Sequence, residues 1–231
     1  NRSDEFHGIS IAGPNSRKVL EKIVRDDVSN EKFRFRDSRR MFVGGVPAII
    51  NRISFTGELG YEIYVAPHFQ IKLYEELMEA GKEFGIKPFG GRALMSMRLE
   101  KNWGAWTLDY RPDFTAKETG LESFINWNKE FIGKEKAKQD NSSNRLVPLI
   151  IQTNDIDVTS NEAVMKGDNS IGYITSGGFA HFVNKSVAFS YIDQKELSSE
   201  DGIQVEINGD LFNCSIIKEP LYDPSGEKMR G

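Results

Sequence analysis

The sequence contains a single cysteine, Cys214, among its 231 residues. One thiol excludes an intramolecular disulfide and a metal site made only of cysteines within the chain. Cys214 lies in a late apolar stretch, where a small buried side chain is the simplest interpretation. The low cysteine content fits a reducing compartment.

Histidine is also scarce. The three residues, His7, His68 and His181, are far apart, and no HxxxH or CxxC spacing occurs. We therefore expect no metal site. The sequence also lacks GxSxG, GxGxxG and P-loop patterns, so it carries no fingerprint for a flavin or a nucleotide.

Strong charge and long hydrophobic runs are missing too. The formal net charge of -4 provides no basic field for nonspecific nucleic-acid binding. No apolar run approaches the roughly 18 residues of a membrane helix, and the polar start shows no signal peptide. We expect neither nucleic-acid nor membrane partners. Because the chain begins at Asn1 rather than methionine, we also expect an N-terminally truncated piece of a longer protein.

The first part of the chain mixes strand and helix signals. Alternating residues predict a strand over 7–12, and Asn15 or Ser16 can cap the helix that follows. A phosphate site at this turn is the weaker alternative, because one glycine beside a proline offers few free N–H groups. Further expected elements are a hairpin over 42–50, a helix over 69–84 and a helix starting at Gly90-Gly91.

The segment 52–65 is the most informative stretch. It predicts two short strands around a glycine-containing turn. Period-two alternation places Glu62 and Tyr64 on the face opposite Tyr61, Ile63 and Val65. A carboxylate on such a strand can accept two N–H bonds from the amidine-like edge of a heterocycle. The same pattern also fits a plain hairpin with a surface glutamate.

The second part of the chain reads as strands only. A polar stretch over 140–144 indicates a linker, and five short apolar runs beyond it predict a small antiparallel barrel. We expect a hairpin turn at Asn208-Gly209 and a loop at 176–179. The predicted domains are residues 1–140, incomplete at the N-terminus, and residues 141–231.

Seven stretches of the sequence resemble the glycine-cleavage T-protein (aminomethyltransferase) family. Among its members, the resemblance is greatest to the C-terminal folate-binding region of dimethylglycine and sarcosine dehydrogenases. The stretches are SFTGELGYEIYV at 54–65, GGRALMSMRLEK at 90–101, WTLDYRPD at 106–113, ETGL at 118–121, FIGK at 131–134, SGGF at 176–179 and EPLYDPSG at 219–226.

The resemblance implies an α+β fold: a folate-binding part with an antiparallel sheet and packed helices, then a C-terminal β-barrel. It also implies that Glu62 hydrogen-bonds the pterin ring of tetrahydrofolate, with Ile63 and Tyr64 beside it. Phe55 stands where many relatives carry tyrosine, which keeps the ring and loses the hydroxyl contact. Phe124 lies near an aromatic position that packs on folate.

The aromatic residues over 103–131 can supply flat walls for the pterin or aminobenzoyl rings, or fill a seam between domains. Arg92 and Arg98 are candidates for steadying the carboxylates of the folate tail. They can equally pair with Glu100 and Glu58. Leu94-Met95 replaces an Arg-Asp pair found in many relatives, which removes one expected tail contact.

The implied reaction captures a one-carbon unit from an N-methyl amine donor to give 5,10-methylenetetrahydrofolate. The family's key aspartate is expected in a segment upstream of this chain, so the catalytic residues here are unknown. Asp109 and Asp113 carry no sign of replacing it. The alternatives are a folate-dependent demethylase acting on another methylated donor, and a non-catalytic scaffold domain with the same fold.

The resemblance also implies the cofactor, the partners and the cellular location of the protein. Tetrahydrofolate is the expected cofactor, and FAD is expected only in a separate upstream flavin domain of the same parent protein. Besides that domain, the expected partners are small molecules, the folate and the methylated amine donor. The expected location is the cytoplasm or, in a eukaryote, the mitochondrial matrix.

Overall fold

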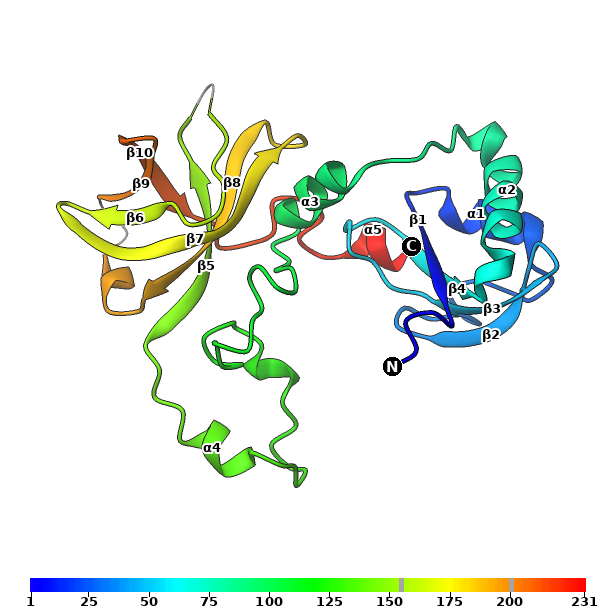
Figure 1. Ribbon diagram of the computed structural model, residues 1–231, viewed down its shortest axis with the longest axis horizontal. Helices are drawn as coiled ribbons and strands as arrows, with labels where there is room; N and C mark the ends of the chain where they lie inside the picture. Colours follow the sequence, from blue (N-terminus) through cyan, green and yellow to red (C-terminus); the bar gives the residue numbers. More distant parts are fainter. Residues whose placement is uncertain (154–155, 200–201) are drawn as a thin grey trace. The chain divides into compact units, whose positions relative to one another are not determined.

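The computed structural model describes residues 1–153, 156–199 and 202–231. The chain forms two compact units, coloured along the sequence in Figure 1. The sheet unit comprises Asn1–Leu94 and Asp223–Gly231, and the barrel unit comprises Met95–Tyr222. The domain boundary expected near residue 140 stays a prediction, since the compact units divide the chain between Leu94 and Met95.

The sheet unit is built on a four-stranded antiparallel sheet with the strand order β1-β4-β3-β2. Its strands are β1 (His7–Ala12), β2 (Ser38–Val43), β3 (Val46–Asn51) and β4 (Gly60–Val65). Two helices, α1 (Ser16–Ile23) and α2 (Gln70–Gly81), contribute their apolar stripes to the same core as Ile11, Ile50 and Ile63. This packing follows directly from the period-two and period-3.6 patterns of the sequence.

The expected helix over 69–84 is α2 with a 3₁₀ turn at each end, Pro67–Phe69 and Lys82–Phe84. Gly85 ends it in the left-handed conformation, with φ of 69°. The expected strand before the turn of residues 52–65 is wrong, because β3 ends at Asn51. Instead, Ser54 Oγ accepts a bond from the Gly57 amide and Thr56 Oγ1 from the Glu58 amide. These local bonds compete with a strand ladder.

The C-terminal segment belongs to the sheet unit and ends in the short helix α5 (Glu227–Arg230). Arg52, 1% exposed, donates to the backbone carbonyls of Phe33 and Arg230. Burial lowers the pKa of the Arg52 guanidinium. Two carbonyl dipoles therefore satisfy part of a buried cation and tie the returning segment to the sheet.

The barrel unit holds a closed antiparallel barrel with the order β10-β5-β8-β7-β6-β9. Its strands are β5 (Asn144–Ile151), β6 (Ala163–Lys166), β7 (Asn169–Ala180), β8 (Lys185–Asp193), β9 (Ile203–Ile207) and β10 (Asp210–Ile216). The expected α+β fold with a C-terminal barrel is therefore confirmed. The interior is apolar, with Leu149, Ile174 and Val205 fully buried.

Three details of the barrel bear on the sequence predictions. Asn208 and Gly209 take φ of 52° and 90° between β9 and β10, as a type I′ hairpin requires. The loop expected over 176–179 is wrong, since these residues belong to β7. Strand β6 escaped prediction because its four residues are too few to establish a period.

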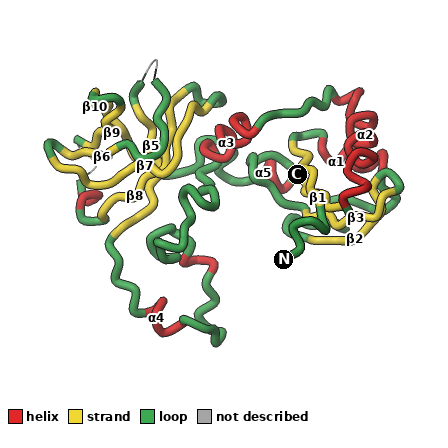
Figure 2. The backbone as a smooth tube through the Cα atoms, viewed as in Figure 1, coloured by secondary structure: helices red, strands yellow, loops and turns green. Residues whose placement is uncertain are grey.

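The part of the barrel unit before β5 is mostly irregular (Figure 2). The helix α3 (Gly91–Glu100), whose residues from Met95 on belong to this unit, is followed by loops, a 3₁₀ turn at Glu122–Phe124 and the short helix α4 (Lys134–Lys138). Among the described residues, every helix is too short or too polar to cross a membrane.

Candidate functional site

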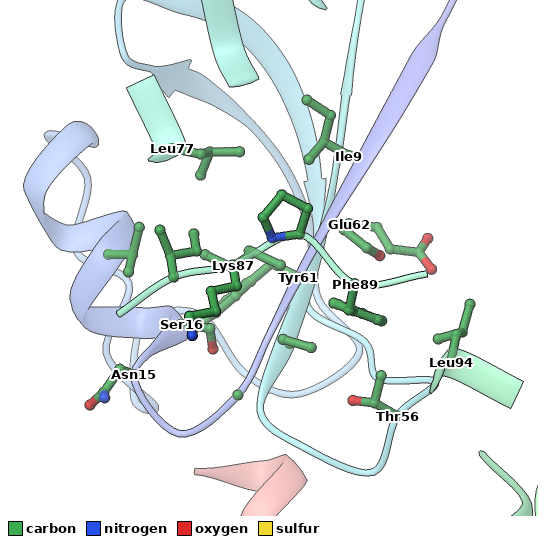
Figure 3. A pocket seen from close by; sticks show the side chains of 18 of the residues that line it. Ile9, Asn15, Ser16, Thr56, Tyr61, Glu62, Leu77, Lys87, Phe89 and Leu94 are labelled. Carbon is green, nitrogen blue, oxygen red and sulfur yellow. The ribbon is translucent and has the colours of Figure 1, made fainter. Parts of the chain in front are cut away.

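The sheet unit contains a cavity of about 660 Å³, which is in the usual size range of small-molecule sites. Figure 3 shows it from close by, with Tyr61, Glu62, Lys87 and Phe89 among its labelled residues. Four stretches of chain line it: β1 with the turn after it, residues 53–56, the start of β4, and the segment from Phe84 to Gly91. Residues of α1 and α2, together with Leu94 of α3, complete the wall.

Glu62 reaches this cavity because of the strand alternation predicted for β4. Ile63 turns into the core, so Glu62 lies on the other face of the sheet, paired with Ser10 of β1 and Asn51 of β3. Tyr64 Oη donates a 2.6 Å hydrogen bond to Glu62 Oε2. That bond, with a smaller contribution from burial, raises the pKa of Tyr64 to about 12. The hydroxyl therefore stays protonated and available as a donor to the carboxylate.

The walls of the cavity are largely aromatic and aliphatic. Aromatic rings come from the turn before β4, from β4 itself, from α2 and from the segment after it: Phe55, Tyr61, Tyr74, Phe84 and Phe89. Such rings bind flat heterocycles, with polar groups at the edge fixing their orientation. Among the lining residues, Glu62 is the acid and Lys87 is the base. The arrangement can hold a flat molecule that presents N–H donors to Glu62.

The structure brings together only part of the predicted site. Phe55 and Glu62 line the cavity. Ile63 is fully buried in the core, and Tyr64 lies beside Glu62 but does not line the cavity. Phe124 belongs to the barrel unit, where its side chain is 78% exposed. Strand periodicity does not reveal the place of Phe124, because that residue lies in a 3₁₀ turn outside the strands.

The two arginines proposed for a folate tail lie in different surroundings. Arg92 is exposed in the first turn of α3. Arg98 is fully buried and donates to Asp109 Oδ2 at 2.7 Å and to the Trp103 carbonyl at 3.0 Å. Its partner is thus Asp109 rather than Glu100 or Glu58. Burial lowers the pKa of Arg98, although the attraction of Asp109 opposes that shift.

Asp109 is the centre of a buried polar cluster in the barrel unit. Besides Arg98, its carboxylate accepts bonds from the Ala105 amide at 2.7 Å, from Ser176 Oγ at 2.7 Å and from Thr175 Oγ1. Tyr191 Oη also donates to the Asp109 carbonyl at 2.8 Å. These bonds attach residues 103–114 to the barrel strands. Four donors saturate the carboxylate, so the arrangement is structural.

Sequence reasoning missed Ser10, Lys87 and Phe89 as cavity residues. The stretch from Ile86 to Phe89 reads as a linker, and only the fold reveals that it runs along the cavity. The Arg98–Asp109 pair was also missed. Arg98 lies on α3, which ends at Glu100, and Asp109 lies in the irregular stretch beyond it, so no helix or strand period of the sequence connects the two.

Family models match most of the chain. The GCVT N-terminal domain matches residues 1–129, and the glycine cleavage T-protein C-terminal barrel domain matches residues 144–223. The barrel match agrees with the closed sheet described above.

Curated relatives include the mitochondrial dimethylglycine dehydrogenase of Homo sapiens, 38% identical over 100% of this chain and 27% of the relative. The aminomethyltransferase of Bacillus mycoides is 32% identical over 97% of this chain and 62% of the relative. The chain therefore spans about a quarter of the first and less than two thirds of the second. The solved aminomethyltransferase T of the Bartonella henselae glycine cleavage system superposes with a TM-score of 0.81 at 23% identity. That match covers 95% of this chain and 60% of that structure.

Proposed function

The chain belongs to the glycine cleavage T-protein family, and we propose that its sheet unit binds the pterin ring of tetrahydrofolate in the cavity beside Glu62. The observation that carries the proposal is the position of this carboxylate. It is the acidic residue among those that line this largely apolar, aromatic-walled cavity in the described structure. A pterin presents two adjacent N–H groups on a flat ring, which is the shape and polarity that this wall complements.

The proposed reaction is the capture of a one-carbon unit from an N-methyl amine, which yields 5,10-methylenetetrahydrofolate. Similarity to dimethylglycine dehydrogenases favours that kind of donor, although another methylated amine would serve the same chemistry. In this proposal, a flavin domain elsewhere in the parent protein oxidises the amine and carries the FAD. The mitochondrial location in the names of relatives such as the human protein supports the matrix as the site of action in a eukaryote.

The acid/base group of the proposed reaction is placed on an aspartate outside these 231 residues. Two features support that placement. Glu62 accepts a hydrogen bond from Tyr64, and Asp109 is saturated by four donors in the barrel unit. The role proposed for the present residues is therefore to bind and orient the folate.

Anaerobic calorimetric titration of the chain with tetrahydrofolate tests the proposal, with Glu62→Gln and Glu75→Gln compared under the same conditions. Glu75 is an exposed residue of α2. Glu75→Gln therefore removes the same charge as Glu62→Gln, but at a position that does not line the cavity. We expect binding that weakens at least tenfold in Glu62→Gln, because a charge-assisted bond is worth roughly 1.5–3 kcal/mol. Glu75→Gln should bind like the unmodified chain. Equal binding by all three proteins would refute the role of Glu62, and no binding by any of them would favour a scaffold domain.

A further inference from the structure

We propose that Tyr64 is a positioning residue that fixes the Glu62 carboxylate, and that Gly8 sets the place of the Tyr64 ring. The inference rests on the proposed function for the identity of the ligand. The positioning itself rests on contacts within the sheet unit and is tested separately below.

The first contact is the bond between the two side chains. Glu62 and Tyr64 are two residues apart on β4, so both point to the same face of the sheet. Tyr64 Oη donates to Glu62 Oε2 at 2.6 Å, the distance of a strong bond between a hydroxyl and a carboxylate. A free glutamate samples several rotamers. This bond selects one and leaves Oε1 and a second lone pair of Oε2 for ligand N–H groups.

The second contact fixes the tyrosine ring. Gly8 of β1 is the cross-strand partner of Tyr64. A Cβ atom at Gly8 would lie 3.0 Å from Tyr64 Cε1 and 3.3 Å from Cδ1. The ring therefore lies against the backbone of β1, in space that any other residue would occupy. The glycine has no positive φ to explain it, so close approach of the ring is its role.

The cavity lining separates the two roles. Glu62 lines the cavity, whereas Tyr64 and Gly8 do not. The hydroxyl therefore acts on the ligand through the carboxylate. Removal of the Tyr64 hydroxyl should lower the affinity only for ligands that contact Glu62.

The binding test compares two ligands, tetrahydrofolate and p-aminobenzoylglutamate, which lacks the pterin ring. Tyr64→Phe should lower the affinity for tetrahydrofolate roughly tenfold, which corresponds to about 1.4 kcal/mol. The affinity for the pterin-free ligand should not change. Tyr173→Phe is the matched control, because it deletes a hydroxyl bonded to Arg111 in the barrel unit. If Tyr64→Phe lowered the affinity for both ligands equally, or for neither, the positioning role would be overturned.

A double-mutant cycle tests the glycine. Gly8→Val fits a strand backbone and displaces the Tyr64 ring, so we expect a loss of tetrahydrofolate affinity similar to that of Tyr64→Phe. The double variant Gly8→Val/Tyr64→Phe should lose little more than either single variant, because both act through one bond. Fully additive losses would refute the link between Gly8 and the hydroxyl.

A measurement without ligand distinguishes failure of the positioning from failure of the proposed function. With ¹³C at tyrosine Cζ, the Tyr64 resonance is identified by its absence in Tyr64→Phe. Glu62→Gln should shift this resonance at pH 7, because the charged acceptor of the hydroxyl is lost. An unmoved resonance would refute the positioning even if folate binds. A shifted resonance in a protein that does not bind folate would refute only the proposed function.

Discussion

Glu62 in the sheet unit and Asp109 in the barrel unit are carboxylates with opposite uses. Asp109 is fully buried and accepts bonds from an arginine, two hydroxyls and a backbone amide. Glu62 is partly exposed beside a cavity, and Tyr64 is the donor recorded for it among the described residues. The saturated carboxylate stabilises the fold, whereas the carboxylate with acceptor capacity left is the one able to bind a ligand.

The surroundings of a carboxylate, rather than its chemical type, thus decide whether it stabilises the fold or can bind a ligand. A buried ion pair tolerates no missing partner, because the remaining charge is left without solvent. A half-buried carboxylate can gain or lose one partner at small cost, since water replaces it. We therefore expect substitutions in the barrel unit to act on stability, and substitutions around Glu62 to act on binding.

The largest expected effect comes from breaking the buried pair on one side. Arg98→Met leaves Asp109 charged and buried, so the barrel unit should lose about 3–5 kcal/mol of unfolding free energy. All three tryptophans of the chain, Trp103, Trp106 and Trp127, lie in this unit. Urea unfolding followed by tryptophan fluorescence therefore reports on it alone.

The matched variant for that experiment removes both charges. Arg98→Met/Asp109→Leu should recover part of the loss, because no uncompensated charge remains and two orphan nitrogens of Arg98, Nε and Nη2, disappear with it. A double variant no more stable than Arg98→Met would show that the remaining donors, rather than the ion pair, dominate the cluster.

A smaller loss is expected from Ser176→Ala, which removes one of the four donors to Asp109. The carboxylate keeps its arginine, so we expect about 1 kcal/mol of destabilisation in the same fluorescence assay. A loss as large as that of Arg98→Met would mean that the hydroxyl, and not the cation, controls the cluster.

Glu62→Gln should change stability by less than about 0.5 kcal/mol, as expected for a substitution that leaves no buried charge unpaired. Hydrogen exchange of the β4 amides measures the stability of the sheet unit, which contains no tryptophan. The same variant is the one expected to lose folate affinity. Strong destabilisation by Glu62→Gln would remove the contrast between the two carboxylates.

The smallest effect is a dependence on alkaline pH. The Tyr64 pKa of about 12 lies above the ordinary value of 10.0, chiefly because of the bond to Glu62. A raised pKa stabilises the folded state fully below pH 10, and this stability is lost as the pH rises through about 12. The stability gap between the unmodified chain and Tyr64→Phe should thus be constant at neutral pH and shrink in that window. Urea unfolding followed by far-ultraviolet circular dichroism at several pH values would detect it, and a gap that widens with pH would contradict it.

Several features of the fold were predictable from the sequence because they depend on local periodicity. The alternation of β4 predicted the separation of Glu62 from Ile63, and Asn208-Gly209 predicted its hairpin. The short strand β6 and the irregular stretch after Arg52 were not predictable. The first is too brief to show a period, and the second is controlled by side-chain bonds from Ser54 and Thr56.

The sequence by itself determined the family, the order of sheet and barrel, and the face of β4 on which Glu62 lies. Only the tertiary structure decided which charged groups are available. Arg98 and Glu62 look equally free in the sequence, yet one is buried against Asp109 and the other borders a cavity. The physical reason is that secondary structure depends on neighbours along the chain, whereas burial and pairing depend on segments brought together from distant positions.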